Sequence, residues 1–299
     1  MSTTVRRILA CALALWVAQS VVMGWGFDAH RYVTDRAIDL LPPPIRPFFD
    51  SRRAFITEHA VDPDLWRTAG FVNEAPRHFL NLDAYGSAPW AALPRTREDA
   101  IRRFGEAVVT ERGLLPWRTV EFFDRLASAF DRYNQRPSGG SLNDVAFYAA
   151  VLSHYVADAH VPLHAVLNYD GQLTGQRGVH ARFETELFYR HRSELAWPSE
   201  APAPIADPLG AIFDILIASE AAAAAVLEAD RQADGAATRY DDRYFARFWT
   251  AVGPVFERRI GEASGALAAF VTGAWEAGGR PRLPGGSRAA GGAEPGGAR

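Results

Sequence analysis

Nine candidate metal ligands lie in order along this chain of 299 residues. They are histidines, carboxylates and one tryptophan: Trp25, His30, Asp64, His78, His154, Asp158, His164, His180 and Glu184. Imidazole nitrogens and carboxylate oxygens together suit zinc or a similar divalent ion. The chemistry that such a set favours is activation of a water molecule for attack on a phosphate ester.

Two of the candidate pairs have helical spacing. His154 and Asp158 are four residues apart, and so are His180 and Glu184. On a helix each pair would lie on one face, about one turn apart. The residues around His154 are largely apolar, so this helix would be buried, and a buried carboxylate and imidazole without partners cost several kcal/mol. One such pair alone fits a hydrogen-bonded His–Asp pair equally well, whereas two independent pairs favour a metal.

Residues 1–24 are typical of a secretory signal peptide, with two arginines, an apolar run and a small residue, Gly24, at the cleavage position. The alternative is a membrane anchor, but the apolar run is short for a bilayer span of about 20 residues. We therefore expect a secreted or periplasmic protein. Cleavage would remove Cys11, the only cysteine, so disulfides could not stabilise the mature chain.

Cleavage after Gly24 would make Trp25 the new N-terminus. A free α-amine and the carbonyl of the same residue can chelate a metal through a five-membered ring. The alternative is that Trp25 is simply a core aromatic residue, and spacing alone favours that alternative. His30 follows five residues later and supports a metal only if Trp25 is a true N-terminus.

Composition indicates one large acidic domain. The whole chain has a net charge of −3, contains no lysine and shows no basic tract. Removal of the signal peptide would leave a more acidic protein, and such a protein is not an obvious ligand for duplex DNA, whose phosphates require clustered cations. Bound zinc ions would change this balance locally, because they would be the largest charges in the site.

Apolar periodicity predicts an all-α fold. Helical spacing recurs through residues 25–278, and no stretch has strand-like alternation of useful length. We therefore expect a single multi-helix domain over 25–278. Residues 279–299 are Gly, Pro, Arg and Ala-rich without apolar periodicity, which predicts a disordered tail.

Three local features suggest where helices begin and end. The residues 62–64 (Asp-Pro-Asp) are typical of a turn. Gly139-Gly140 predicts a break, with Ser141 as the N-cap of the next helix. Gly253-Pro254 predicts an interruption in the long apolar-periodic stretch 241–275.

The ordered ligand set resembles the phospholipase C/P1 nuclease superfamily, whose members are all-helical and hold three zinc ions in a cleft. The stretches that carry the resemblance are Trp-Gly-Phe-Asp-Ala-His at 25–30 and His-Tyr-Val-Ala-Asp-Ala-His-Val-Pro-Leu-His at 154–164. The resemblance implies three zinc sites: one formed by Asp64, His78, His154 and Asp158, a second by His164, His180 and Glu184, and a third by Trp25, His30 and a bridging Asp158. It also implies that Asp64 accepts a proton in catalysis, although Asp62 is close enough in sequence to compete.

The resemblance divides on the substrate. The short spacing from Trp25 to His30 resembles the single-strand nucleases, whereas Glu184 and the short loop before His180 resemble phospholipase C. Phe79 is a candidate substrate-binding residue in either case, and other rim candidates are Trp66, Tyr85 and the loop 168–172.

Three functions remain open from the sequence. They are a phospholipase C-like hydrolase, a single-strand nuclease, and a non-catalytic exported zinc protein stabilised by its metals. Nine ligands for three metals leave coordination positions for water, which favours an enzyme. The expected substrate is a phosphodiester, either a phospholipid head group or single-stranded nucleic acid.

Overall fold

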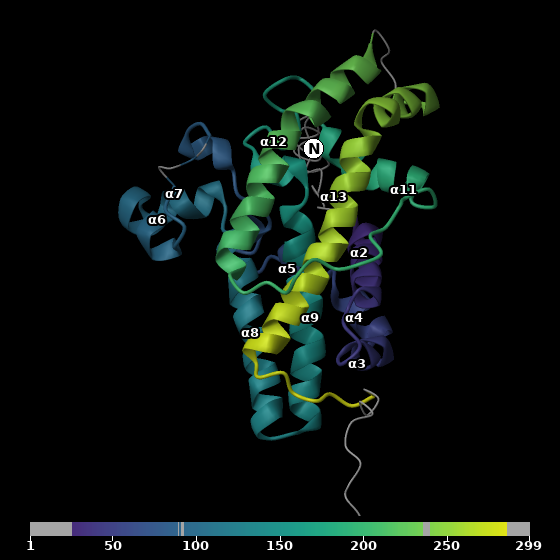
Figure 1. Cartoon of the computed structure of the whole chain (residues 1–299). Coiled ribbons are helices and arrows are strands. Elements are labelled where there is room, and N and C mark those ends of the chain that lie inside the picture. Colours follow the sequence, from purple (N-terminus) through teal and green to yellow (C-terminus); the bar gives the residue numbers. More distant parts are fainter. Residues whose placement is uncertain (1–25, 89, 91–92, 236–239, 286–299) are drawn as a thin grey trace, which may run out of the picture.

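The computed structural model describes residues 26–88, 90, 93–235 and 240–285, which form helices and no strands (Figure 1). The all-α prediction is therefore confirmed for these residues. The expected signal peptide and Trp25 lie outside them. The helical elements are α2 (Phe27–Asp39), α3 (Arg46–Ser51), α4 (Arg53–His59), α5 (Asp62–Thr68), η1 (Ala75–His78), η2 (Leu82–Tyr85), α6 (Arg97–Phe104), α7 (Glu106–Arg112), α8 (Leu115–Gln135), α9 (Gly139–Ala159), η3 (Pro162–Ala165), α10 (Val179–Ala181), a π-helical segment η4 (Arg182–Glu186), α11 (Leu187–His191), α12 (Pro208–Asp234) and α13 (Asp242–Ala277).

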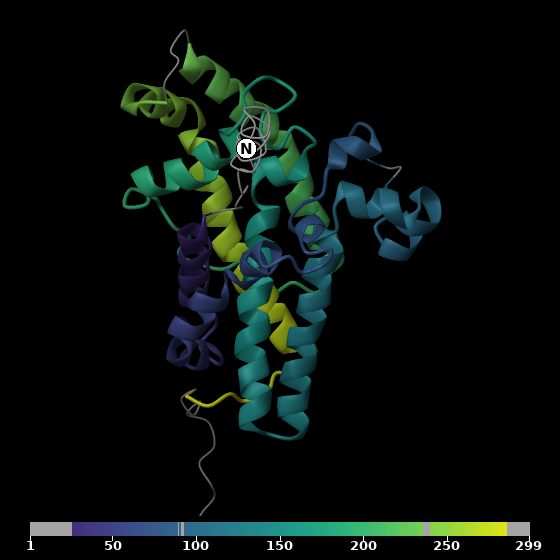
Figure 2. The same cartoon turned by 180° about the vertical axis from the view of Figure 1, so that it is seen from behind.

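Helix α9 is the central element of the bundle. It contacts α8, α13, α4 and α2, and it lies among them in both views (Figures 1 and 2). Every residue from Ala149 to His160 is buried. A helix that is apolar all round is favoured in such a position. The few polar side chains on this stretch are consequently held inside the core.

The start of α9 differs from the sequence prediction. Ser138, not Ser141, is the N-cap, and its hydroxyl accepts a hydrogen bond from the Ser141 backbone N–H. The expected break at Gly139-Gly140 is wrong, because these glycines form the first turn of the helix. A capping hydroxyl satisfies a backbone donor that no carbonyl can reach, and this outweighs the low helix propensity of two glycines in a first turn.

The segment 62–64 is the first turn of α5 rather than an isolated turn. Pro63 occupies an early helical position, where its missing N–H is not needed. The helix buries the Asp64 side chain, which is 1% exposed. Asp62 lies on another side and contacts the His59 ring nitrogen at 2.8 Å.

Helix α13 is continuous over 36 residues and carries Pro254 inside it, so the expected interruption at Gly253-Pro254 is wrong. An internal proline costs about 3 kcal/mol because one hydrogen bond is lost. Phe248 before it and Phe256 after it are both fully buried in the same hydrophobic cluster. Burial of two such side chains offsets this cost, since each is worth about 1.5–3 kcal/mol.

The expected disordered tail is wrong for its first part. Residues 279–285 are described, and Leu283 is buried in the main hydrophobic cluster. The Trp275 indole N–H also donates to the Pro281 carbonyl at 3.0 Å. A single well-placed leucine and one indole hydrogen bond fix this segment, and composition alone does not reveal either. Residues 286–299 lie outside the described residues.

Helix α12 is long and apolar enough to cross a membrane by length and composition. In the structure it packs against η3, α13 and α8. Its buried side chains include Phe213, Leu216 and Val226. These contacts are those of a helix in a protein core. Such a helix can be as apolar as a membrane-spanning one, so its hydropathy alone does not indicate a membrane span.

Candidate metal centre

Eight of the nine candidate ligands converge in one buried cluster. They come from separate elements: His30 from α2, Asp64 from α5, His78 from η1, His154 and Asp158 from α9, His164 from η3, His180 from α10 and Glu184 from η4. Each of these residues is at most 5% exposed. The ninth, Trp25, lies outside the described residues.

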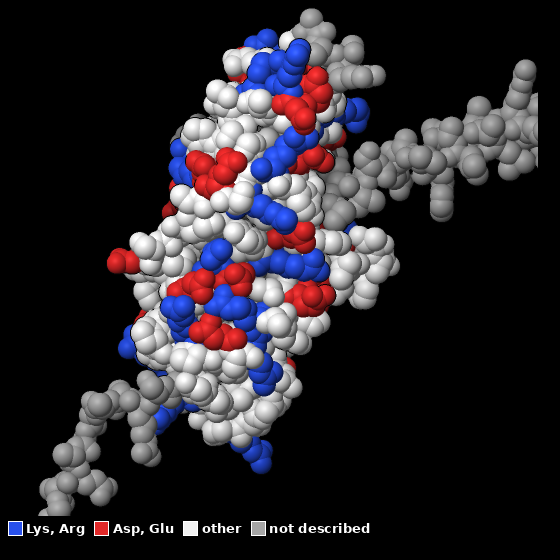
Figure 3. Space-filling view, turned by 90° about the vertical axis from the view of Figure 1, so that its right-hand side faces the viewer, with Lys and Arg blue, Asp and Glu red and all other residues white. Residues whose placement is uncertain are grey.

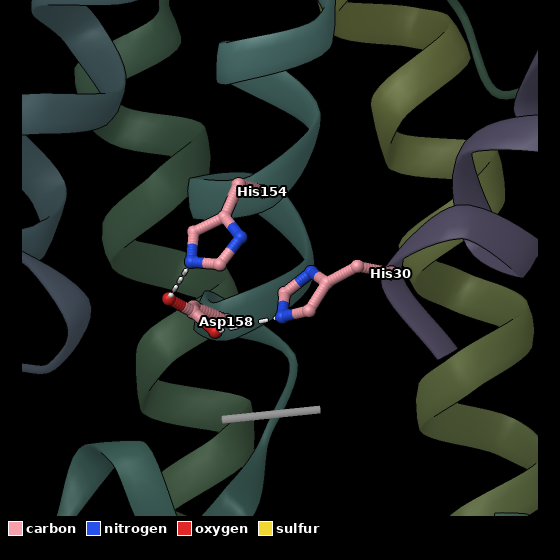
Figure 4. Close-up of side chains that lie close together, drawn as sticks. All are labelled: His30, His154 and Asp158. Carbon is pink, nitrogen blue, oxygen red and sulfur yellow. Dashed lines mark ion pairs between the residues drawn. The ribbon is translucent and has the colours of Figure 1, made fainter. Parts of the chain in front are cut away.

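Asp158 lies at the centre of the cluster. Its Oδ1 atom is 3.5 Å from His30 Nε2 and 3.5 Å from His164 Nδ1. Its Oδ2 atom is 3.0 Å from His78 Nδ1 and 3.2 Å from His154 Nε2. Figure 4 shows His30 and His154 directed at this carboxylate from α2 and from one turn earlier in α9. One carboxylate therefore joins four imidazoles, as a ligand shared by two metals would.

Asp64, His78 and His154 form one potential metal group, with their ligand atoms within 4.8 Å of one another. The closest pair is His154 Nε2 and His78 Nδ1, at 3.0 Å. His154 Nδ1 lies 3.0 Å from the Ala60 carbonyl, to which it donates. That bond fixes the tautomer in which Nε2 carries a lone pair toward the cluster, as zinc requires.

His164, His180 and Glu184 form a second group. His180 Nε2 is 2.9 Å from Glu184 Oε1 and 3.2 Å from His164 Nε2. The other ring nitrogen of His180 donates to the Tyr169 carbonyl at 2.9 Å. Here too a backbone carbonyl sets the tautomer and leaves the inward nitrogen as an acceptor.

Many buried polar atoms in this cluster have no hydrogen-bond partner among the described residues. They are both side-chain oxygens of Asp64 and of Glu184, Oδ1 of Asp158, both ring nitrogens of His30, Nε2 of His78 and Nδ1 of His164. Buried polar groups in proteins are otherwise nearly always paired. Facing lone pairs without donors repel each other, and a cation removes that repulsion. The donor set of imidazole and carboxylate fits zinc.

Burial shifts the protonation of these ligands. It lowers the pKa of His164 to about 3 and raises the pKa of Glu184 to about 7, the latter despite the opposing effect of His180. Burial alone would also raise the pKa of Asp158, but His154 and His164 hold it well below its usual value. Burial also lowers the pKa of His30. For His154 and His180 the effect of burial is outweighed by Asp158 and Glu184 respectively, so their pKa values are raised. Glu184, and any imidazole that carries a second proton, must lose that proton to bind a cation.

Glu74 is a buried residue that the sequence reasoning missed. It is 2% exposed and accepts a hydrogen bond from the Tyr155 hydroxyl at 2.6 Å. Its Oε1 atom also lies 3.9 Å from His78 Nε2, on the side of the ring away from Asp158. A carboxylate behind a ligand histidine orients the ring. The helical i, i+4 spacing of Glu74 and His78 was the available signal.

Arg182 anchors the segment that carries His180 and Glu184. Its guanidinium donates to Asp230 Oδ1 at 2.8 Å, and both side chains are almost fully buried. The Tyr244 hydroxyl donates to the same oxygen. These contacts tie the π-helical segment to α12 and α13. No local sequence pattern indicates this pair, because Arg182 and Asp230 are distant along the chain.

Gly26 brings the start of the described chain to the same segment. It is buried, and a Cβ atom placed on it would lie 3.1 Å from Thr185 Oγ1. Thr185 follows Glu184 directly. The position next to Trp25 is therefore beside the ligand cluster, although Trp25 itself is outside the described residues.

A cavity of about 220 Å³ opens beside the cluster. Its lining includes three of the ligands together with apolar and polar neighbours: Arg67, Ala75, His78, Phe79, Asn81, Leu163, His164, Tyr169 and His180. Phe79, the candidate substrate-binding residue, is thus on its wall. Two other rim candidates pack elsewhere, Tyr85 against Phe104 and Trp66 against Phe147.

Arg67 is the one arginine among the described residues that line this cavity. Its Nη2 atom lies 3.1 Å from Asp64 Oδ1. The sequence reasoning missed it, although it follows Asp64 by one helical turn. A guanidinium there can hold a phosphate oxygen next to the ligand cluster.

His160 turns away from the cluster. Its Nδ1 atom lies 2.7 Å from the Val156 carbonyl, and its backbone carbonyl accepts a hydrogen bond from Arg259. Burial, with a contribution from the Arg259 charge, lowers the pKa of His160 to about 3. It lines a different cavity, beside α13, so it is not a ligand of this centre.

Comparison with known protein families identifies a match. A family model described as zinc dependent phospholipase C matches residues 29–233, which covers more than half of the chain and all eight converging ligands. No curated protein matches the chain.

Proposed function

Because the chain belongs to the zinc-dependent phospholipase C family, within the phospholipase C/P1 nuclease superfamily, we propose that it is an exported hydrolase that cleaves the phosphodiester of a phospholipid. The observation that carries this proposal is the set of unpartnered imidazoles and carboxylates beside a cavity with a largely apolar wall. Such a site combines phosphate-activating groups with space for the apolar part of a lipid.

The cluster would hold zinc in three places. Asp64, His78 and His154 with Asp158 would hold one ion, and His164, His180 and Glu184 a second. His30 and Asp158 would hold a third together with the amine and carbonyl of Trp25. Zinc bound there supplies a water of lowered pKa and positive charge opposite the phosphate oxygens.

The chain's own residues have separate roles in this proposal. Asp64 accepts a proton, since its buried carboxylate faces the cluster and, among the described residues, makes no hydrogen bond beyond its 3.1 Å ion pair with Arg67. Arg67 binds a phosphate oxygen and neutralises charge that builds up during attack. Phe79 and Tyr169 line the cavity wall, where they exclude water and contact the apolar part of the substrate.

A nuclease would use the same cluster and would stack a base on Phe79. It would also require a track of cations for the strand. The face formed by α2, α3 and α4 shows arginines interleaved with acidic side chains (Figure 3). Arg53 there contacts Asp35, Asp39 and Asp50. These carboxylates balance the charge of Arg53, so this part of the surface is not a free track of cations for a strand.

The test uses protein that begins at Trp25, loaded with zinc and assayed with short-chain phosphatidylcholine, bis-p-nitrophenyl phosphate and single-stranded DNA. We expect hydrolysis of the phosphatidylcholine that a chelator and His154→Ala both abolish. His191→Ala is the matched control, because His191 stacks on Trp249 outside the cluster. Cleavage of DNA alone would replace the lipase proposal with the nuclease, and no turnover by zinc-loaded protein would leave a non-catalytic zinc protein.

A further inference from the structure

We propose that two apolar loops beside the cavity dock the enzyme on the surface of a lipid bilayer. The first comprises residues 65–73, which are the last turn of α5 and the loop that follows it, and the second comprises residues 167–176; both are called the rim loops below. This inference rests on the proposed function, because it names the physical state of the substrate: lipid assembled in a membrane rather than dissolved lipid.

Exposed large hydrophobic side chains gather in the rim loops. Nine such side chains occur among the described residues, and six of them are in these two loops: Leu65, Phe71, Val72, Leu167, Tyr169 and Leu173. Val72 is 81% exposed and Leu173 is 70% exposed, the two highest values of the nine. Scattered exposed apolar residues are ordinary, but a cluster marks an interaction site.

The rim loops flank the cavity that holds the candidate ligands. Arg67 of the first loop and Tyr169 of the second both line that cavity. Ala75, just after the first loop, lines it too. Both rim loops therefore reach the wall of the cavity, so a surface that binds them would lie close to the site.

The backbone of the first rim loop fixes its tip. Gly70 and Asn73 have φ angles of 80° and 62°, and they flank Phe71 and Val72. The Phe71 N–H donates to the Trp66 carbonyl at 3.0 Å, which closes the turn. Positive φ is unusual for a residue other than glycine, and asparagine is among those that tolerate it. The turn thus holds two apolar side chains outward at a defined place.

The second rim loop is fixed by its own side chains. Asn168 Oδ1 accepts a hydrogen bond from the Leu173 N–H at 2.8 Å. The Gln172 amide donates to the Leu167 carbonyl at 2.6 Å. The Asn168 and Gln172 side chains thus form hydrogen bonds within the loop. Leu167 and Leu173 can therefore enter an apolar environment without stripping water from these two polar side chains.

The charge pattern of the rim loops suits a membrane surface. Their only charged residues are Arg67 and Asp170. Arg67 contacts Asp64, and Asp170 accepts hydrogen bonds from the Gly178 and His180 backbone N–H groups. The exposed carboxylate next to the second rim loop is that of Asp83, and it accepts hydrogen bonds from the Leu167 backbone N–H. The rim loops differ from the α2–α4 face, which is dense in paired charges (Figure 3). Apolar tips of this kind enter the head-group region, where their burial drives binding.

The first test measures binding without catalysis. The zinc-loaded protein is sedimented with phosphatidylcholine vesicles, and Val72→Asp/Leu173→Asp is compared with Phe55→Asp. Phe55 is also an exposed apolar residue, but it lies on α4, outside the rim loops. We expect vesicle affinity to fall roughly tenfold or more in the double variant, since two buried side chains are lost. We expect little change in the control. Equal binding by the two variants would overturn the proposal.

The second test separates docking from chemistry. The double variant should keep its kcat/KM on monomeric short-chain phosphatidylcholine and lose activity on vesicles. Equal losses on both substrates would show that the rim loops shape the cavity instead of docking the protein, and would overturn the proposal. If the wild-type protein hydrolyses no phosphatidylcholine in any form, the proposed function fails, while the vesicle sedimentation still decides whether the rim loops bind a bilayer. Loss of single-stranded DNA binding by the double variant, with vesicle binding intact, would assign the loops to nucleic acid.

Discussion

His180 Nε2 lies 2.9 Å from Glu184 Oε1, and the backbone between them changes from α-helix to π-helix. In the π-helical segment Arg182–Glu186 the chain is wound more widely than in an α-helix. Single π-helical turns inside helices are frequent at functional sites. Here the π-helical turn carries the Glu184 carboxylate, and the buried contact between Arg182 and Asp230 holds this turn in place.

Zinc affinity should fall as pH falls below about 7. Burial raises the pKa of Glu184 to about 7, and a cation must displace this proton before it can bind the carboxylate. His164 adds no such dependence near neutrality, because its pKa is lowered to about 3. His154 and His180 add to it, because Asp158 and Glu184 raise their pKa values against the effect of burial. The apparent zinc affinity should therefore drop up to about tenfold per pH unit for Glu184 alone. Zinc titrations between pH 5.5 and 8.5 check this, and Glu184→Gln should flatten the profile.

In the metal-free protein, Glu184 should make the folded state less stable as pH rises, which is opposite to its effect on zinc affinity. Native Glu184 keeps its proton up to about pH 7, whereas an unfolded glutamate loses it near its ordinary value of 4.5. The native state binds more protons in this window, so this contribution to stability is complete below pH 4.5 and is lost as pH rises toward 7. Urea unfolding in chelator should show that Glu184→Gln destabilises less, relative to wild type, at pH 7 than at pH 4.5. An unchanged difference would contradict the buried, protonated Glu184.

Removal of the Arg182 guanidinium should damage both stability and zinc binding. Arg182→Met would leave Asp230 buried without its cation, which costs about 3–5 kcal/mol. The freed π-helical segment should also weaken zinc binding at His180 and Glu184. Arg190→Met is the control, because Arg190 is on the adjacent α11 with a partly exposed side chain. Restored stability without restored zinc affinity in Arg182→Met/Asp230→Asn would support a positioning role.

Asp64 and Asp62 should respond differently to the same substitution. Asp64→Asn removes a carboxylate whose oxygens face the cluster, so it should lower bound zinc and reduce kcat at least a hundredfold, a typical effect of losing a catalytic base. Asp62→Asn affects only the outer contact with His59 and should leave both values nearly unchanged. Metal analysis and initial rates provide the comparison. Equal effects of the two variants would contradict the assignment of Asp64.

The position of the chain start should control the third zinc ion. Protein that begins at Trp25 is expected to bind one more zinc ion than protein carrying a single extra alanine before Trp25. The extension would move the α-amine away from the chelating position, while the neighbour Gly26 stays against Thr185. Metal analysis after dialysis distinguishes the two forms. An extension that leaves the zinc count unchanged would show that Trp25 is not a ligand.

Local information in the sequence was enough for the helices and for the paired ligands. The spacing of His154 and Asp158, and of His180 and Glu184, predicts a shared face because helical periodicity is a property of a few consecutive residues. The all-α class follows from the same periodicity. The ends of helices could not be predicted as well from the sequence. Ser138 and Ser141 are both suitable N-caps, and Pro63 suits a turn as well as the first turn of a helix.

Only the tertiary structure decided which residues meet. Asp64 faces the cluster and Asp62 does not, although only Pro63 separates them, because one side of α5 packs against α9. Glu74, Arg67 and the Arg182–Asp230 pair acquire their roles from contacts between distant segments, which no local pattern encodes. The exposure of the apolar side chains in the rim loops also depends on the tertiary structure, because an apolar residue in a sequence is equally compatible with a buried position. Its direction is fixed only when the rest of the chain packs around it.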